Sequence, residues 1–69
     1  MAVIKVIELV GQSKTSWEDA VKAAVKEASK TIRHISGVEV LNWTGRVDDD
    51  EIVKYRANVK IAFKVTSDD

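Results

Sequence analysis

Apolar and polar side chains alternate along the C-terminal third of the chain, between Ile52 and Thr66. The apolar members of the series are Val53, Tyr55, Ala57, Val59, Ile61, Phe63 and Val65. A period of two predicts a β-strand with one face in a core and one face in water. Dense apolar and β-branched residues predict two further strands, over Ala2–Val10, where the run stops at Gly11, and over Gly37–Val47.

A helical period marks the segment between the first two predicted strands. Apolar residues recur there at steps of three and four, which predicts an amphipathic helix; they are Ala20, Val21, Ala24, Val25, Ala28, Ile32 and Ile35. Ser16 with Asp19, or Thr15 with Glu18, has the spacing of a capping box at the helix start, and Gly37 is predicted to end the helix. Because so many buried positions are alanine, the helix buries little apolar area, and neighbouring subunits are expected to add to it.

Four acidic residues separate the second and third predicted strands: Asp48, Asp49, Asp50 and Glu51. A connection this short joins antiparallel neighbours. A turn centred on its two middle residues predicts three cross-strand pairs, namely Val38 with Ile61, Val40 with Val59, and Trp43 with Arg56. The first two pairs suit the face covered by the helix. The third puts Trp43 on the opposite face, together with Arg56, Lys54, Asn58 and Leu41, although a shift of one residue would exchange the faces.

These elements predict one α+β domain over residues 1–69, with the order β-α-β-β and a three-stranded antiparallel sheet packed on one helix. A chain of 69 residues buries only roughly 60% of the surface that it exposes when unfolded. The chain has no cysteine, so disulfides cannot add stability, and self-association is the expected remedy.

Charge and hydropathy argue against a nucleic-acid-binding protein and against a membrane-spanning one. Eleven basic residues balance eleven acidic ones, which leaves no net field to attract nucleic acid. No apolar run approaches the roughly 20 residues of a membrane span, and the amino terminus does not resemble a signal peptide. The absence of cysteine fits a reducing compartment, so we expect a cytoplasmic protein.

The sequence contains no set of residues typical of an enzyme. His34 is the single histidine, and there is no cysteine, no Ser-His-Asp arrangement and no paired carboxylates suited to acid–base catalysis. His34 lies near the predicted helix end, where an imidazolium can interact with the last carbonyls. We therefore expect a protein that is not an enzyme.

Two groups of residues are candidate binding sites. Trp43, Arg56 and Lys54 would combine an indole face with cations, which suits a planar or phosphorylated ligand. The alternative is that Trp43 packs in a subunit interface, where Trp and Arg are enriched.

The acidic residues Asp48, Asp49, Asp50 and Glu51 offer oxygen ligands of the kind that Ca²⁺ or Mg²⁺ takes. They lack EF-hand spacing, and the alternative is a solvated turn. In a symmetric assembly the turns of several copies would meet near an axis and gather their carboxylates there.

Six short segments form a colinear set along nearly the whole chain: Ile4–Gly11 followed by Ser13, Ala28–His34, Glu39 with Val40, Gly45, Tyr55, and Val59–Phe63. Their order and spacing resemble the dodecin family. The resemblance implies that twelve such subunits form a hollow sphere, a homododecamer. In the flavin-binding members it also implies storage or sequestration of flavins such as riboflavin or FMN.

The sequence departs from the flavin-binding dodecins at the ligand positions. Those proteins carry a Trp after the helix, in a Trp-Phe-Glu-Val run, whose indole stacks on the flavin; here the run begins with Gly37. They carry a Gln after the Tyr of the third strand, and here that residue is Arg56. The Arg-Gly pair of their second strand is Thr44-Gly45 here. A Trp at the helix start, here Trp17, is a feature that resembles a flavin-poor branch of the family, described as calcium dodecins.

Three functions therefore remain. The first is a shell that stores a flavin or related cofactor at subunit junctions, with Arg56, Trp43 and Lys54 as ligand residues. The second is a cation-binding or purely structural shell in which Gly37 marks the loss of flavin stacking. The third, a monomeric binding module, would need a self-sufficient core that the alanine-rich helix does not supply.

Overall fold

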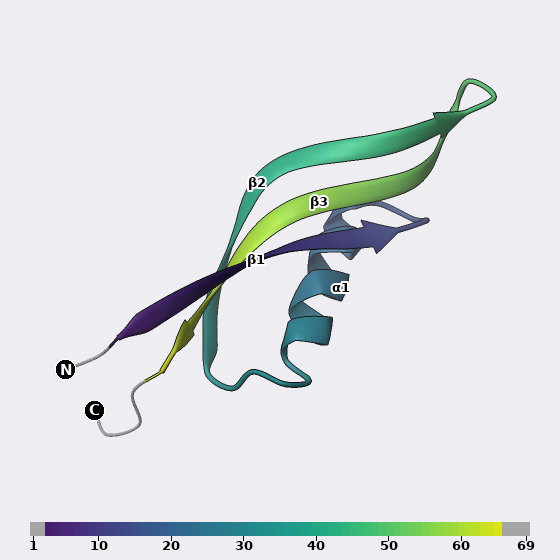
Figure 1. Cartoon of the computed structure of the whole chain (residues 1–69). Coiled ribbons are helices and arrows are strands. Elements are labelled where there is room, and N and C mark those ends of the chain that lie inside the picture. The colour runs from purple at the N-terminus through teal and green to yellow at the C-terminus, as the bar shows by residue number, and fades with distance from the viewer. Residues whose placement is uncertain (1–2, 66–69) are drawn as a thin grey trace.

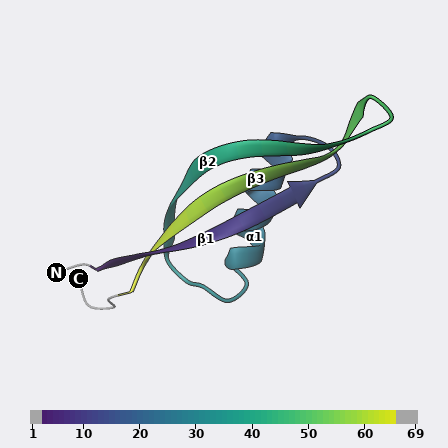
Figure 2. The same cartoon turned by 45° about the horizontal axis from the view of Figure 1, so that its top comes forward.

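The computed structural model describes residues 3–65 and confirms the predicted α+β order. Its elements are β1 (Ile4–Ser13), α1 (Trp17–Ala28), β2 (Ile35–Asp48) and β3 (Glu51–Lys64). The predicted strand ends at Ala2 and Thr66 lie outside the described residues. β3 is the central strand, in the order β1-β3-β2, and both of its neighbours are antiparallel to it. The helix crosses one face of the sheet, and the β2–β3 hairpin extends well beyond it (Figure 1, Figure 2).

The helix begins where the sequence predicts. Ser16 is its N-cap, and the Ser16 hydroxyl accepts the backbone N–H of Asp19 at 3.0 Å. The Asp19 carboxylate does not turn back to close a capping box; it accepts a hydrogen bond from the buried Ser13 hydroxyl at 2.8 Å. The Ser13 oxygen also accepts the N–H of Thr15 at 2.9 Å. These bonds fix the angle at which β1 passes into the helix.

The helix ends at Ala28, well before Gly37, so the predicted end is wrong. The backbone N–H groups of Ser29 and Ile32 close the last turn on carbonyls of residues 25 and 28. His34 then adopts a left-handed φ of 64°, which helical geometry does not allow. Ile32 still packs on the core, as its spacing predicts, but from a loop. Gly37 lies within β2, where the pairing register shifts.

Small residues bring the helix close to the sheet. The buried core consists of Ala20, Ala24 and Ala28 from α1, with Ala57, Val59 and Ile61 from β3. A Cβ atom at Gly11 would lie 2.0 Å from the backbone oxygen of Ala20. Only glycine therefore allows this distance between β1 and α1.

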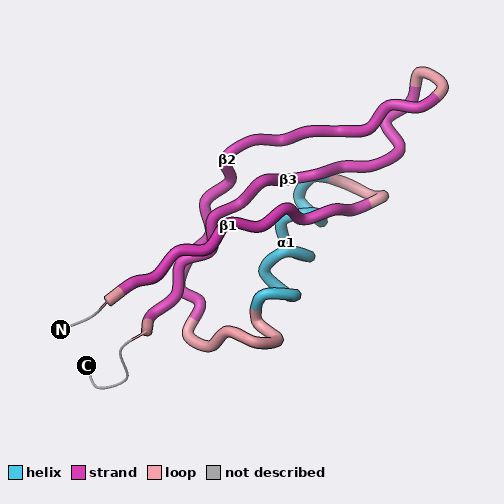
Figure 3. The backbone as a smooth tube through the Cα atoms, viewed as in Figure 1, coloured by secondary structure: helices cyan, strands magenta, loops and turns pink. Residues whose placement is uncertain are grey.

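The predicted hairpin turn is confirmed. Asp49 and Asp50 have φ values of 54° and 65°, as a two-residue turn between antiparallel strands requires. Beyond the turn, Val38 pairs with Ile61 and Val40 with Val59, as predicted. Figure 3 shows the resulting long, continuous hairpin.

The predicted pairing of Trp43 with Arg56 is wrong. Counted from the turn, the register shifts first between Val47 and Arg46, where Val53 is an extra residue on β3, and shifts back between Asn42 and Val40, where Leu41 is an extra residue on β2. Trp43 therefore pairs with Ala57, and Thr44 pairs with Arg56. Since directly paired residues point to the same side of a sheet, Trp43 lies on the helix-covered face, opposite to the face that carries Arg56.

The single chain is extended for its length. Its Cα radius of gyration is 14.2 Å, against about 11 Å for a compact domain of 69 residues. Over residues 3–65 the structure contains no helix with the length and apolarity needed to cross a membrane. The sheet extends beyond the helix at both ends, with the β2–β3 hairpin at one end and the start of β1 beside the end of β3 at the other (Figure 1).

Candidate functional site

Within residues 3–65, no helix or strand packs on the sheet face away from α1, and we call it the open face. Ala57, Val59 and Ile61 of β3 are buried under the helix, so the even-numbered residues from Lys54 to Ala62 point to the open face. The pairing of the strands assigns their neighbours. From β3 the open face carries Lys54, Arg56, Asn58, Lys60 and Ala62, from β1 it carries Val6, Glu8, Val10 and Gln12, and from β2 it carries Gly37, Glu39, Asn42, Thr44 and Arg46.

Two side-chain hydrogen bonds cross the strands on the open face. Arg56 Nε donates to Gln12 Oε1 at 2.8 Å, which links β3 to β1. Asn58 Nδ2 donates to Asn42 Oδ1 at 2.6 Å, which links β3 to β2. The centre of this face is therefore a ladder of amide and guanidinium groups that still has donors and acceptors free for a ligand.

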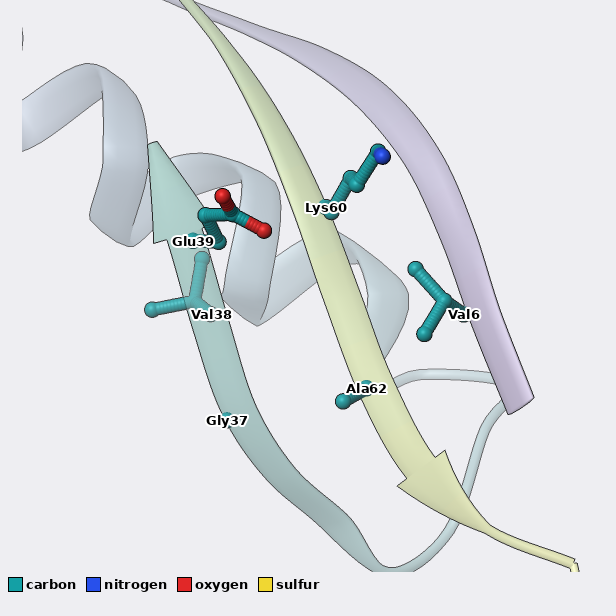
Figure 4. A pocket seen from close by; sticks show the side chains of 6 residues that line it. All are labelled: Val6, Gly37, Val38, Glu39, Lys60 and Ala62. Atoms are coloured by element: carbon teal, nitrogen blue, oxygen red, sulfur yellow. The ribbon is translucent and has the colours of Figure 1, made fainter. Parts of the chain in front are cut away.

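A depression of about 400 Å³ lies further along the open face, over all three strands. Figure 4 shows its lining residues, which are Val6 on β1, Lys60 and Ala62 on β3, and Gly37, Val38 and Glu39 on β2. A Cβ atom at Gly37 would meet no other atom within 4 Å. Lys60 stands between Glu8 and Glu39, its partners on the two flanking strands. The depression thus combines an apolar floor with a charged rim.

The predicted ligand residues do not all lie together in the single chain. Lys54 and Arg56 are neighbours on the open face, and both are half-buried. Trp43 lies on the other face and is 52% exposed. The assignment of a ligand to these three residues stays a prediction, but the indole and the guanidinium cannot form one platform within the same chain.

Trp43 belongs instead to an aromatic cluster on the helix side. The Trp17 ring meets Tyr55 edge to face at a centroid distance of 4.8 Å and Trp43 at 6.4 Å. Trp17 Nε1 donates to the backbone oxygen of Thr44 at 2.7 Å. The cluster ties the start of α1 to the hairpin, and the exposed Trp43 ring enlarges the apolar surface there.

The acidic turn does not form a metal site within one chain. Asp48 and Glu51 face each other across the strands, and Asp49 and Asp50 form the turn itself. Among residues 3–65, no three Asp, Glu, His or Cys side chains converge on a point that could hold an ion. The predicted metal ligands Asp48 to Glu51 would thus need carboxylates from further copies.

Sequence reasoning missed Gln12, Asn42 and Arg46. The first strand was predicted to stop before Gly11, but β1 continues to Ser13 and brings the Gln12 amide to Arg56. Asn42 and Arg46 reach the open face only because the extra residue at Leu41 reverses the alternation of β2. The register of β1 on β3, which brings Gln12 to Arg56, and the bulge at Leu41 leave no clear signal in the sequence.

Comparison with known proteins agrees with this architecture. The dodecin family model matches residues 3–66. The calcium dodecin of Mycobacterium tuberculosis is 35% identical over 65 residues, covering 94% of this chain and 92% of that protein. The dodecin of Thermus thermophilus is 33% identical over 63 residues, covering 91% of each chain.

Solved structures show the same fold. The dodecin of Streptomyces coelicolor superimposes with a TM-score of 0.91 at 28% identity, covering 97% of this chain and 96% of that one. The crystal structure of the calcium-chelating M. tuberculosis calcium dodecin, which has a calcium-binding site, gives a TM-score of 0.81 at 33% identity with the same coverage. With a family match over almost its entire length and the β-α-β-β sheet on one helix, the chain belongs to the dodecin family.

Proposed function

We propose that this protein is a non-enzymatic subunit of a homododecameric shell that binds and stores a small planar ligand, a flavin or a related cofactor, at the junctions between copies. The observation that carries the proposal is the open face. It combines the depression beside Gly37 with the polar ladder of Gln12, Arg56, Asn42 and Asn58, and no element of the single chain covers it.

Exposed apolar side chains support self-association. Val6 and Val10 on the open face are 50% and 59% exposed, and Trp43 and Val47 elsewhere on the hairpin are 52% and 64% exposed. Large apolar groups on several surfaces of a small domain mark contacts with other chains. The alanine-rich core and the extended shape also support self-association, because the single chain covers little of its own sheet.

Light scattering tests the assembly. A mass close to twelve times the 7.7 kDa of the chain supports the shell, and a mass near that of one chain refutes it. This measurement does not depend on any ligand, so it separates the assembly from the binding function.

Fluorescence titration with riboflavin and FMN tests the ligand. Quenching by the wild-type protein supports a flavin. The Gly37→Trp variant places an indole where the backbone leaves open space, and we expect it to strengthen flavin binding at least tenfold. Binding by the variant alone would mean that the natural ligand is not a flavin, and no binding by either protein would refute the flavin proposal.

A cation-binding shell is the second candidate, because the M. tuberculosis relative is a calcium dodecin. In this proposal the acidic turns of several copies bind Ca²⁺ or Mg²⁺. Thermal unfolding with and without Ca²⁺ tests it, since a bound ion raises Tm by mass action. The control variant Asp49→Asn with Asp50→Asn keeps residues that tolerate positive φ and removes two charges. Equal Tm shifts in wild type and variant would refute binding at the turn.

A further inference from the structure

Three cations form a continuous group on the open face at the distal end of the hairpin. Arg46 of β2 pairs directly with Lys54 of β3, and Arg56 follows Lys54 on the same face. Thr44 pairs with Arg56 and closes the group. We call Arg46, Lys54 and Arg56 the basic group. Like charges directly opposite each other destabilise a strand pair, so their presence in the folded chain needs an explanation.

Within residues 3–65, no acidic side chain neutralises the basic group. The ion pairs of residues 3–65 join Lys22 to Glu18 and Lys30 to Glu27, and they lie on or next to α1. Among residues 3–65, no carboxylate oxygen lies within 4.0 Å of a charged nitrogen of the basic group. The nearest acidic pair of the ladder, Asp48 with Glu51, is two pairs closer to the turn.

Arg56 is held in a fixed orientation. Its Nε donates to Gln12 Oε1 at 2.8 Å, and the residue is half-buried. A guanidinium held through Nε keeps its two Nη groups free to donate. Gln12 thus acts as a positioning residue that limits the side-chain entropy lost when Arg56 binds a ligand.

We propose that the basic group is an anion subsite that binds the phosphate group of a phosphate monoester, a step that rests on the proposed small-ligand function and narrows its ligand class. Residues two apart on a strand lie about 7 Å apart and paired residues about 5 Å, so the long side chains of Arg46, Lys54 and Arg56 reach one common point. The Thr44 hydroxyl adds a fourth donor at its edge.

The charge of the basic group favours phosphate over carboxylate. A carboxylate carries one charge and is satisfied by a single bidentate guanidinium. A phosphate monoester carries a charge of about −1.5 to −2 near pH 7 and three strong acceptor oxygens. Three cations and a hydroxyl can donate to all three phosphate oxygens, and the negative charge of the phosphate offsets the repulsion between Arg46 and Lys54.

Two measurements test the subsite, and the first needs no organic ligand. Thermal unfolding of the full chain is recorded in sodium phosphate and in sodium chloride of equal ionic strength. We expect phosphate to raise the Tm of the wild type and of the control variant Arg33→Gln, which removes the same charge from an exposed loop residue. The Arg46→Gln and Arg56→Gln variants should lose this shift. Equal Tm values in the two salts for the wild type would overturn the proposal.

The second measurement compares FMN with riboflavin, which differ by one phosphate group. We expect the wild type to bind FMN at least tenfold more tightly than riboflavin, Arg46→Gln to abolish the difference, and the control Arg33→Gln to keep it. Equal affinities for the two flavins in the wild type would overturn the subsite and leave flavin storage standing. A phosphate-specific Tm shift without binding of either flavin would support the subsite and refute flavin storage.

Discussion

The contact between β1 and α1 depends on the absence of a side chain at Gly11, and Gly11→Ala tests this directly. The added Cβ would lie 2.0 Å from the backbone oxygen of Ala20 and 3.0 Å from the Cβ of Ala24. Carbon atoms in van der Waals contact are about 3.5–4.0 Å apart, so the helix must retreat by more than about 1 Å. A backbone carbonyl in a helix cannot rotate away as a side chain can.

The cost of this movement follows from the gap that it opens. A helix of 12 residues is about 18 Å long and covers a strip about 10 Å wide. Lifting it by about 1 Å opens about 180 Å³ if the movement is uniform, and about half of that if only one end moves. At about 24 cal/mol per Å³ of cavity, the loss is about 2 to 4 kcal/mol. A chain of 69 residues has a total stability of about 3 to 10 kcal/mol, so the effect is large.

Gly37→Ala is the matched control. The same Cβ atom added there meets nothing within 4 Å, and none of the described glycines has a positive φ. We expect a change between zero and a gain of about 1 kcal/mol, because alanine restricts the unfolded chain. Urea unfolding followed by circular dichroism at one protein concentration measures both variants. Equal unfolding midpoints for Gly11→Ala and Gly37→Ala would refute the argument that close helix–sheet approach stabilises this fold.

Three smaller changes give further tests, each measured by urea unfolding at one protein concentration. Ser16→Ala removes the N-cap hydroxyl of α1 and should cost about 1 kcal/mol, whereas an unchanged midpoint would mean that water replaces the cap. Trp17→Phe keeps a ring in the aromatic cluster but loses the hydrogen bond to the Thr44 oxygen, so we expect a loss of about 1 kcal/mol; a loss no larger than experimental error would show that the bond contributes nothing. Arg46→Gln relieves repulsion from Lys54 and should stabilise the protein in chloride by about 0.2 to 1 kcal/mol, and destabilisation would indicate that Arg46 has a favourable partner in the folded protein.

The alternating pattern of β3 was sufficient to predict its two faces. It assigned Ala57, Val59 and Ile61 to the core and Lys54 and Arg56 to the opposite side, and the structure places them there. Burial enforces this alternation, because a slip of one residue on the central strand would expose the entire core. The turn at the acidic residues was predictable for a related reason, since its length determines how the hairpin closes.

The sequence did not predict where the alternation of β2 breaks or where the helix ends. Leu41 is apolar like Val40 before it, and nothing in its identity indicates that it is the extra residue of a bulge. Ile32 continues the helical spacing, yet it reaches the core from a loop. The pattern correctly indicates the burial of Ile32 but not the backbone path that achieves it, and Leu41 is apolar although it is 39% exposed.

The bulge at Leu41 determines what kind of ligand the open face can recognise. It moves Trp43 to the helix side, where Trp17 and Tyr55 already lie, and Phe63 is on an odd position of β3 that faces the same way. These four residues are all the aromatic residues of the chain. The open face of one chain therefore offers amides, guanidinium groups and apolar patches, but no ring for stacking. Where stacking is absent, selectivity rests on charge and hydrogen bonds, so we expect this face to prefer a phosphate-bearing ligand to a neutral planar one.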